Sequence, residues 1–447
     1  MTTAASGEHA ITGSRAADIA TSVEQGVSSG AFPPGSALPP MRQLAARLGV
    51  NLHTVAAAYR TLRERGLIET DGRRGSRVRA EPATFPRGAL HAGLPPGVRD
   101  LADGNPDPAL LPPLTGALTA AALRYDRRPR LYGDALVVPD LERAARTAFD
   151  ADGVPAGPVV LTSGALDAIE RALSAHLRPG DAVAVEDPGW AALHDLVPAM
   201  GLRVLPVAVD DDGPRPESLA AALEVGARAL IVTDRAQNPT GAVLTATRAA
   251  ALRERLSRHP HVLVIDDDHG YGIVEQPPHP LAGATRSWAF VRSTAKAYGP
   301  DLRLAVCTAD PVTADRVAGR HRLGPGWVSG LLQYAVADLW ESGTMDGAAV
   351  ARSYGERRDV LIAALARRGV PAHGRSGLNV WVPVPDETRA VTRLLTAGWA
   401  VAPGARFRVD AAPGIRITVS RLAAAEVEEL AGAVAAAVRP GRPARQD

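Results

Sequence analysis

The chain has 447 residues, which is too long for one typical domain and predicts two or three of them. Its balance of 46% hydrophobic and 22% charged residues is typical of an ordinary globular protein. A single cysteine, Cys307, excludes an intrachain disulfide and fits a reducing cytoplasm. Neither a bilayer-spanning apolar run nor a signal peptide is recognisable, so we expect a cytoplasmic protein without contact to a membrane.

The charge is distributed unevenly along the chain. Residues 1–80 contain ten arginines and six acidic residues, a net charge of +4, whereas the whole chain carries +2. The rest of the chain therefore sums to −2. A basic N-terminal part on a slightly acidic body is a hint of contact with nucleic acid, because phosphates attract basic surfaces.

The pattern of residues 13–78 predicts helices followed by a β-hairpin. A first helix is indicated by apolar residues at helical spacing, namely Ile19, Val23 and Val27. A short second helix is expected over residues 40–48, and a third helix over residues 51–65, with glycines just after both. Residues 67–70 and 76–78 predict the two strands of the hairpin.

Residues 80–98 are rich in Pro, Gly and Ala and predict a linker between a domain of residues 11–79 and one of residues 99–440. In the second domain, short apolar runs alternate with helical patterns, which predicts an open, mainly parallel α/β sheet with helices on both faces. Four runs predict buried parallel strands: residues 158–162, 182–185, 229–233 and 262–266. From about residue 345 we expect a smaller α+β part that ends in a helix over residues 423–438.

Two helices joined by a tight turn and followed by a hairpin describe a winged helix-turn-helix, whose second helix enters the major groove of DNA. The side chains that we expect on this DNA-binding helix are Asn51, His53, Thr54, Tyr59 and Arg60. At the tip of the hairpin, Arg73 and Arg74 are expected to reach phosphates or the minor groove. The alternative is a small helical domain with a solvated basic face.

This part of the chain resembles the GntR family of bacterial DNA-binding domains. The resemblance is carried by Leu38-Pro39-Pro40-Met41-Arg42-Gln43-Leu44-Ala45 and by Leu48-Gly49-Val50-Asn51-Leu52-His53-Thr54-Val55. It implies that Arg42 contacts the DNA backbone and that the helix starting at Asn51 reads bases. The chain departs from the family at Pro40, where a serine is usual, and at Leu52, where an arginine is usual. These departures affect the operator preference rather than DNA binding itself.

The second domain contains the only lysine of the chain, Lys296, although the chain has 50 basic residues. Arginine can replace lysine at a surface position, but a guanidinium does not lose its proton and cannot act as a nucleophile. A lysine amine can form a Schiff base with an aldehyde, and pyridoxal phosphate (PLP) is the common protein-bound aldehyde. The alternative is a lysine that survived by chance in a chain biased toward arginine.

Four motifs follow one another in the order that PLP chemistry needs. Residues 162–167 connect a strand to a helix start that can hold an anion, and residues 235–241 form a turn that presents an amide. Residues 266–268 are three aspartates at a strand end, where at least one carboxylate needs a cation such as a protonated pyridine nitrogen. The fourth motif combines a nucleophile with phosphate ligands: Ser293, Lys296 and Arg303. Each motif alone has an ordinary alternative, such as a turn or a metal site, but together they favour a PLP site.

Residues 99–440 resemble the fold-type I aminotransferases, most specifically in Asn238-Pro239-Thr240-Gly241 and Ser293-Thr294-Ala295-Lys296. The resemblance implies that Lys296 forms the aldimine with PLP. It implies further that Asp267 pairs with the pyridine nitrogen and that Asn238 bonds the ring hydroxyl. The phosphate would be held by Ser293, Arg303 and the backbone N–H groups of Ala165 and Leu166.

Three further roles follow from the same resemblance. Trp190 would stack on the cofactor ring, and Tyr132 would reach the phosphate of the partner subunit in a homodimer. Arg416 resembles the arginine that grips the carboxylate of a substrate. The alternatives are core packing for Trp190, an interface or core tyrosine for Tyr132, and a structural ion pair for Arg416.

The chain also departs from the aminotransferase pattern. His269 stands where a tyrosine is usual, and Tyr271 follows two residues later, so one of them is expected to touch the ring hydroxyl, with His269 favoured. Val137 replaces a glycine, and Arg292 replaces a small residue before Ser293. The changes at His269 and Arg292 are expected to alter the surroundings of the cofactor and to weaken transaminase turnover.

A GntR-like winged helix followed by an aminotransferase-like domain is the layout of the MocR subfamily of bacterial transcription regulators, which the whole chain resembles. We therefore expect a PLP-dependent regulator that binds an operator in double-stranded DNA and senses PLP, an amino acid or an amine at Lys296. At most residual aminotransferase activity is expected. Two alternatives remain: a working aminotransferase with an appended DNA-binding module, and a regulator that has lost PLP binding.

Overall fold

The structure, a computed structural model, describes residues 10–28, 31–33, 35–64, 67–70, 75–78 and 94–439. The chain forms two compact units, each with apolar cores of its own. Within the described residues, no helix has the length and apolar character needed to cross a bilayer.

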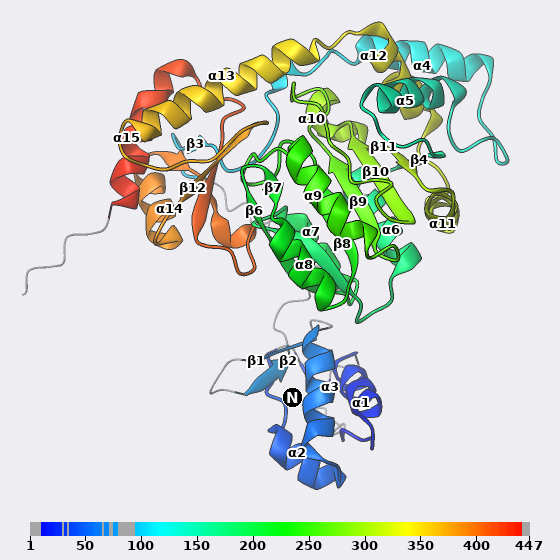
Figure 1. Ribbon diagram of the computed structural model, residues 1–447, viewed down its shortest axis with the longest axis vertical. Coiled ribbons are helices and arrows are strands. Elements are labelled where there is room, and N and C mark those ends of the chain that lie inside the picture. The colour runs from blue at the N-terminus through cyan, green and yellow to red at the C-terminus, as the bar shows by residue number, and fades with distance from the viewer. Residues whose placement is uncertain are drawn as a thin grey trace, which may run out of the picture. The chain divides into compact units, whose positions relative to one another are not determined.

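In its described residues, the N-terminal unit consists of three helices and a two-stranded antiparallel hairpin (Figure 1). These elements are α1 (Ala16–Ser28), α2 (Met41–Leu48), α3 (Leu52–Glu64), β1 (Ile68–Thr70) and β2 (Ser76–Val78). Both α1 and α2 pack against α3. Their shared core contains the apolar residues that the helical spacing placed on one face, among them Ile19, Val23, Leu44, Val55 and Leu62.

The turn between α2 and α3 has the local chemistry of a helix-turn-helix. Gly49 closes α2 with a φ of 65°, in the left-handed region that glycine adopts without strain. The side chain of Asn51 then accepts a hydrogen bond from the His53 backbone N–H at 2.8 Å, which caps the start of α3. The predicted winged helix-turn-helix fold is therefore confirmed, while the predicted hairpin tip with Arg73 and Arg74 lies outside the described residues.

The C-terminal unit is built on an eight-stranded sheet with the order β4-β11-β10-β9-β8-β5-β6-β7. Strands β8, β9 and β10 pair in parallel, while β11 runs antiparallel to both β10 and β4. The strands are β4 (Val159–Thr162), β5 (Ala182–Asp187), β6 (Arg203–Asp210), β7 (Gly213–Pro214), β8 (Ala227–Thr233), β9 (Leu263–Asp268), β10 (Ser287–Ser293) and β11 (Ala305–Ala309). The four predicted strands correspond to β4, β5, β8 and β9, but β4 lies at the sheet edge and pairs antiparallel with β11, where parallel pairing was predicted.

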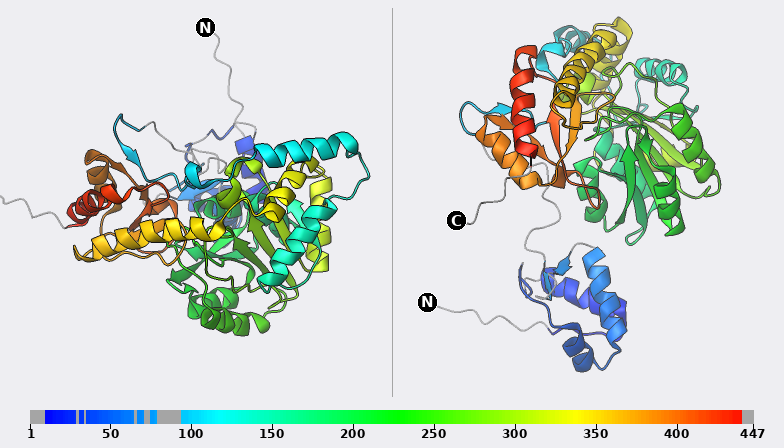
Figure 2. Two further views of the ribbon diagram at one scale, coloured as in Figure 1. Left: turned by 90° about the horizontal axis from the view of Figure 1, so that it is seen from above. Right: turned by 60° about the vertical axis from the view of Figure 1, so that its left-hand side comes forward.

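Helices cover both faces of this sheet, with α6 packed on β9 and β10 and α8 packed on β8 (Figure 2). The helices around the sheet are α4 (Thr115–Arg127), α5 (Pro139–Ala151), α6 (Ala165–His176), α7 (Ala191–Ala199), α8 (Pro216–Glu224), α9 (Ala246–Ser257), α10 (Ala295–Tyr298), α11 (Pro311–Arg322) and α12 (Gly330–Ser342). Apolar residues from the helices and strands form one large core between these layers.

A smaller α+β part forms a second core in the same unit. Its three-stranded sheet has the order β12-β15-β14, and a separate short pair joins β3 to β13. The elements are β3 (Arg99–Asp100), α13 (Gly347–Ala366), β12 (Asn379–Pro383), α14 (Glu387–Thr396), β13 (Trp399–Ala400), β14 (Ala402–Pro403), β15 (Gly414–Thr418) and α15 (Val427–Val438). The predicted fold class, a mainly parallel sheet with a smaller C-terminal α+β part, is confirmed.

The register of the central strands brings three chemical motifs to one edge of the sheet. Asp267, near the end of β9, pairs with Thr233 at the end of β8 on one side and with Val291 in β10 on the other. Because the three strands are parallel, the loops that follow them leave from the same edge. The turn containing Asn238 and the helix containing Lys296 therefore begin beside Asp267.

Candidate functional site

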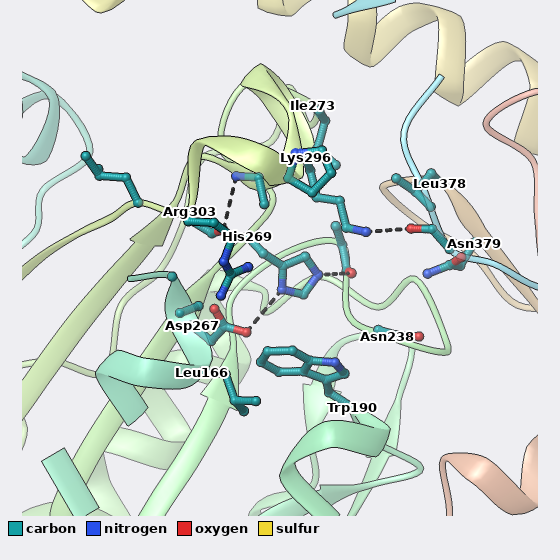
Figure 3. Close-up of a pocket in the computed structure, with 18 of the residues that line it drawn as sticks. Leu166, Trp190, Asn238, Asp267, His269, Ile273, Lys296, Arg303, Leu378 and Asn379 are labelled. Carbon is teal, nitrogen blue, oxygen red and sulfur yellow. Dashed lines mark hydrogen bonds and ion pairs between the residues drawn. The ribbon is translucent and has the colours of Figure 1, made fainter. Parts of the chain in front are cut away.

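A pocket lies at this edge of the sheet and is also lined by residues of β12 and β15 (Figure 3). Its lining consists of Gly104, Gly164, Ala165, Leu166, Trp190, Ala236, Asn238, Asp267, His269, Ile273, Ser293, Ala295, Lys296, Pro300, Arg303, Leu304, Leu378, Asn379 and Arg416. The structure thus brings together every predicted cofactor and effector residue except Tyr132.

Lys296 lies on the short helix α10 and points its amine into the pocket (Figure 3). The amine donates a hydrogen bond to the carbonyl oxygen of Gly104. Burial, together with the positive charge of Arg416, lowers the pKa of Lys296 to about 8. A larger share of the amine than in an ordinary lysine is therefore unprotonated near neutral pH, as a lysine nucleophile requires.

The three aspartates at the end of β9 are all buried, and Asp267 faces the side of the sheet opposite to Asp266 and Asp268, because alternate residues of a strand face opposite sides. Asp268 accepts hydrogen bonds from Arg235 at 2.8 Å and from Arg292 at 2.9 Å, which hold its pKa at about 2. Asp266 accepts the backbone N–H groups of Leu281 and Ala282 and lies beside Asp234, and burial raises the pKa of both carboxyls. The sequence predicted that at least one of these carboxylates needs a cation. Asp268 is the one that is paired with cations, namely the two arginines.

Asp267 alone faces the pocket. Its Oδ2 atom lies 3.2 Å from His269 Nδ1, whereas its Oδ1 atom is buried and has no hydrogen-bond partner among the described residues. A buried carboxylate oxygen without a donor costs free energy, so a ligand that donates there would be favoured. A protonated pyridine nitrogen is such a donor, and in this respect the residues present fit PLP.

Another part of the pocket lining has the features of an anion site. The helix α6 begins at Ala165, and its first backbone N–H groups need acceptors. Gly164 precedes the helix with a φ of 108°, and a β-carbon at this position would lie only 2.9 Å from Arg303 Nη2. Arg303 is fixed in turn by donating to the Ser163 carbonyl oxygen at 2.7 Å. With Ser293 also in the lining, this cradle fits the phosphate of PLP.

Arg416, on β15, contacts groups on both sides of the pocket. Its guanidinium donates to Asn238 Oδ1 at 3.1 Å and to the Ala102 carbonyl oxygen, and it lies 4.8 Å from the centre of the Phe407 ring. Burial, and to a smaller extent the charge of Arg406, lowers its pKa to about 10 although Asp103 raises it, so that it remains cationic at neutral pH. Its Nε atom is buried without a partner among the described residues. One donor of this pocket-lining arginine is therefore without an acceptor in the part of the chain that the structure describes.

Two of the expected residue roles need correction. His269 lines the pocket, but its Nδ1 faces Asp267 and its Nε2 lies 2.8 Å from the Ala236 carbonyl oxygen, so neither nitrogen is left for a ring hydroxyl. Tyr271 does not line the pocket, and its ring packs against Trp340 and the guanidinium of Arg292. Sequence distance alone could not show where these side chains point.

Arg292 was expected to alter the surroundings of the cofactor, and this expectation is also wrong. Its side chain is fully buried and binds Asp268 and Asp152. Because Arg292 precedes Ser293 on strand β10, the two side chains face opposite sides of the sheet. Only Ser293 lines the pocket.

Tyr132 does not line the pocket either. Its side chain is 92% exposed, and its ring makes an edge-on contact with Trp327 at 5.3 Å. Leu131 beside it is also largely exposed. Both side chains are thus accessible on the surface of the chain, as the expected contact with a partner subunit requires.

Sequence reasoning missed two residues that matter in the pocket. Gly104 supplies the carbonyl oxygen that accepts from Lys296, and a backbone role of this kind leaves no signal in the sequence. Asn379, on β12, accepts the Thr418 hydroxyl at its Oδ1, which orients the amide. The fold brings it to the pocket from a distant part of the chain, and no motif in the sequence identified it.

Most of the predicted DNA-binding side chains that the structure describes are exposed. Arg42 at the start of α2 is exposed, as are Asn51, His53 and Arg60 around α3, and Thr54 is half-buried. Tyr59 is the exception, because it is 2% exposed and its hydroxyl donates to the Pro39 carbonyl oxygen at 2.8 Å. It therefore belongs to the core of the unit and cannot contact DNA as expected.

Comparisons with known proteins identify both parts of the chain. Residues 15–78 match the bacterial regulatory proteins of the gntR family, and residues 98–434 match aminotransferase class I and II. The chain is 42% identical to the vitamin B6 salvage pathway transcriptional repressor PtsJ of Salmonella typhimurium, over 94% of this chain and 98% of that protein. It is 28% identical to the HTH-type transcriptional regulator TauR of Rhodobacter capsulatus, over 86% and 88% of the two chains.

Solved structures give the same fold for the C-terminal unit. The multiple substrate aminotransferase of Thermococcus profundus is similar with a TM-score of 0.69 at 21% identity, over 79% of this chain and 97% of that one. The aspartate aminotransferase of Rhizobium meliloti is similar with a TM-score of 0.67 at 24% identity, over 76% and 91%. The chain therefore belongs to the MocR subfamily of GntR transcription regulators, DNA-binding proteins that join a winged helix to an aminotransferase class I and II domain.

Proposed function

We propose that this regulator binds PLP covalently through Lys296 and that PLP, or an amino compound reacting there, changes its affinity for an operator. The observation that carries the proposal is the sole lysine, which lies in a pocket together with Asp267, whose Oδ1 atom has no hydrogen-bond partner within the described parts of the chain. The Salmonella typhimurium relative is named as a repressor of vitamin B6 salvage. We therefore favour PLP as the effector and repression of vitamin B6 genes as the output.

The side chains of the pocket have distinct roles in this proposal. PLP, when bound, supplies an aldehyde that amines attack and a ring that withdraws electrons. Asp267 would accept the ring nitrogen, Asn238 would lie near the ring hydroxyl, and Trp190 would stack on the ring. The phosphate would be held by Ser293, Arg303 and the backbone N–H groups of Ala165 and Leu166. We propose domain limits of 11–79 and 99–440, with a linker at 80–98 of which residues 80–93 lie outside the described residues.

The covalent step can be tested with the purified protein and its Lys296→Ala variant. Wild-type protein incubated with PLP should show a new absorbance band near the visible edge and should retain the cofactor after borohydride reduction. The variant should lose both signals, because the only other amine in the chain is its α-amino terminus. Arg375→Ala, at an exposed ion pair with Asp212, is the matched control and should behave as wild type. An equal yield of trapped cofactor in Lys296→Ala would disprove the assignment.

A second candidate function is aminotransferase activity, which the position of Arg416 in the pocket favours. An arginine with a donor available there can bind the carboxylate of an amino acid in a planar, bidentate manner.

If an amino acid is the effector, Arg416→Ala should abolish the response of DNA binding to that amino acid while PLP is retained. If PLP itself is the effector, the same variant should leave regulation unchanged. Titration of DNA affinity with PLP and with amino acids separates the two cases.

We also propose that the protein is a homodimer in which Tyr132 reaches the phosphate bound by the partner subunit. Exposed apolar side chains near the Tyr132 loop support an interface, because isolated proteins seldom expose several large apolar residues together. Leu131 is 71% exposed, Tyr132 is 92% exposed, and Leu123 on the preceding helix α4 is 54% exposed. A two-fold dimer would also present two winged helices to a repeated or palindromic operator.

A further inference from the structure

His269 occupies a position that the proposed function does not yet explain. It follows β9 directly, two residues after Asp267, and its ring lies in the pocket wall between Asp267 and the Ala236 carbonyl oxygen (Figure 3). The aminotransferase-like pattern has a tyrosine here, whose hydroxyl could serve a ligand. The imidazole instead directs both of its nitrogens at protein atoms.

The partners of the two nitrogens determine the charge of the ring. The Ala236 carbonyl oxygen can only accept, so Nε2 at 2.8 Å must carry a proton. A neutral ring would then present a bare Nδ1 to the Asp267 carboxylate oxygen at 3.2 Å, which places two acceptors against each other. A doubly protonated ring donates to both partners. The hydrogen-bonding geometry therefore favours an imidazolium paired with a carboxylate.

The charged groups around His269 agree with this assignment. Burial and the charge of Lys296 lower its pKa, but the charge and hydrogen bond of Asp267 and the hydrogen bond to Ala236 raise it more, so the net shift is upward. Asp267 and Lys296 are the titratable groups with the largest effects on this pKa among the described residues. The ring thus stays protonated above the pH at which an ordinary histidine loses its charge.

This arrangement leaves Asp267 with one oxygen bound to a cation and one oxygen, Oδ1, without a partner in the described structure. If the pyridine nitrogen of PLP approaches Oδ1, it shares the single negative charge of Asp267 with the imidazole of His269. The imidazolium of His269 and a protonated pyridine nitrogen are both positively charged and repel each other. Protonation of one of them therefore makes protonation of the other less favourable, although both are attracted by Asp267. A lone carboxylate would favour a protonated ring nitrogen more strongly.

We propose, on the basis of the proposed PLP function, that His269 is a positioning residue that pairs with Asp267 and competes with the cofactor ring nitrogen for its negative charge. The pair fixes the orientation of the carboxylate while it reduces the tendency of the ring nitrogen to be protonated. A less protonated ring withdraws electrons less well. His269 thus favours a site that holds its ligand and reports on it over a site that turns substrates over.

The test measures the protonation of the ring nitrogen directly. Wild-type protein is loaded with PLP labelled with 15N in the ring, and the 15N chemical shift is followed from pH 5 to pH 10. Two variants separate charge from packing: His269→Gln keeps a donor for Asp267 without a charge, and His269→Phe removes both. His373→Gln is the matched control, because His373 pairs with another aspartate, Asp211, outside the pocket.

We expect the midpoint of ring-nitrogen protonation to rise in both His269 variants by about one pH unit, which corresponds to roughly a ten-fold change in proton affinity. The midpoint of His373→Gln should equal that of wild type. A midpoint that rises only in His269→Phe would assign a packing effect and overturn the inference, as would a midpoint unchanged in both variants. Absence of a bound PLP signal in wild type would instead refute the proposed function, and the inference would fall with it. Thermal unfolding of each variant identifies any that fails to fold.

Discussion

Lys296 shows how a residue acquires reactivity from its surroundings. Its pKa of about 8 results first from burial and second from the charge of Arg416. The sequence could predict the identity of this residue, because an arginine cannot replace a lysine nucleophile. It could not predict the contribution of Arg416, which is 120 positions away in the chain and is brought to the pocket by another sheet.

The rate of covalent PLP capture should therefore depend on pH in a defined way. The unprotonated amine is the nucleophile, so the rate should rise with pH up to about 8 and then become constant. Arg416→Gln removes a positive charge that opposes protonation of Lys296, so its midpoint should move upward toward the ordinary value of 10.5. Stopped-flow absorbance at a series of pH values measures both midpoints. An unchanged midpoint in Arg416→Gln would show that burial alone lowers the pKa.

At the scale of elements, strand β9 shows what a pattern can and cannot reveal. Its apolar run and acidic end predicted a buried strand with at least one carboxylate held by a cation. The partners of Asp268 depend on the pairing of β9 with β8 and β10, because Arg235 and Arg292 are supplied from those neighbours. The sequence does not state this pairing, and for that reason Arg292 was expected to alter the surroundings of the cofactor and not to bind Asp268 and Asp152.

Arg292→Met should destabilise the C-terminal unit by about 3 kcal/mol, because it leaves a buried carboxylate with one cation fewer. Chemical denaturation measures this loss. The double variant with Asp268→Asn should lose less than the sum of the two single losses, since the pair acts together. Arg258→Met, at an exposed helical ion pair with Glu254, is the control and should cost no more than about 0.5 kcal/mol. Equal losses of stability in Arg292→Met and Arg258→Met would contradict the stabilising role of the buried pair of Arg292 and Asp268.

Helix α3 carries residues that we expect to contact DNA as well as residues that hold the fold together. The sequence placed both Tyr59 and Arg60 on the DNA side, but the packing of α1 and α2 against α3 buries the tyrosine. A helical pattern identifies an apolar stripe but leaves the position of its boundary open, and an amphipathic tyrosine can lie on either side.

Arg42→Ala and Arg60→Ala should each weaken DNA binding. Each should also reduce the slope of the logarithm of the binding constant against the logarithm of the salt concentration, by the share of about one phosphate contact. The hairpin variant Arg74→Ala is expected to behave in the same way. Tyr59→Phe should cost about 1 kcal/mol of stability through the lost hydrogen bond to Pro39 and should leave the salt dependence unchanged. Fluorescence anisotropy over a range of salt concentrations measures these slopes. A flattened slope in Tyr59→Phe would place this residue at the DNA after all.

At the scale of the whole molecule, the proposed dimer predicts sites shared between two chains. Tyr132→Ala and Lys296→Ala should each impair PLP binding as homodimers. A heterodimer of the two variants should regain one intact site, because one of its sites combines the native lysine with the native tyrosine. Mixing the two proteins under conditions of subunit exchange and measuring trapped PLP tests this expectation. Lack of recovery in verified heterodimers, or a monomer that binds PLP tightly, would contradict a shared site.

The most direct test of the central claim is the affinity for DNA as a function of PLP concentration. The DNA is a duplex selected from a random pool by the wild-type protein, and the variant for comparison is Lys296→Arg, which keeps the positive charge but cannot form the covalent bond. We predict that PLP shifts the dissociation constant of the wild-type complex and leaves that of Lys296→Arg unchanged. An equal response of the two proteins, or no response of wild-type protein that demonstrably holds PLP, would contradict the account.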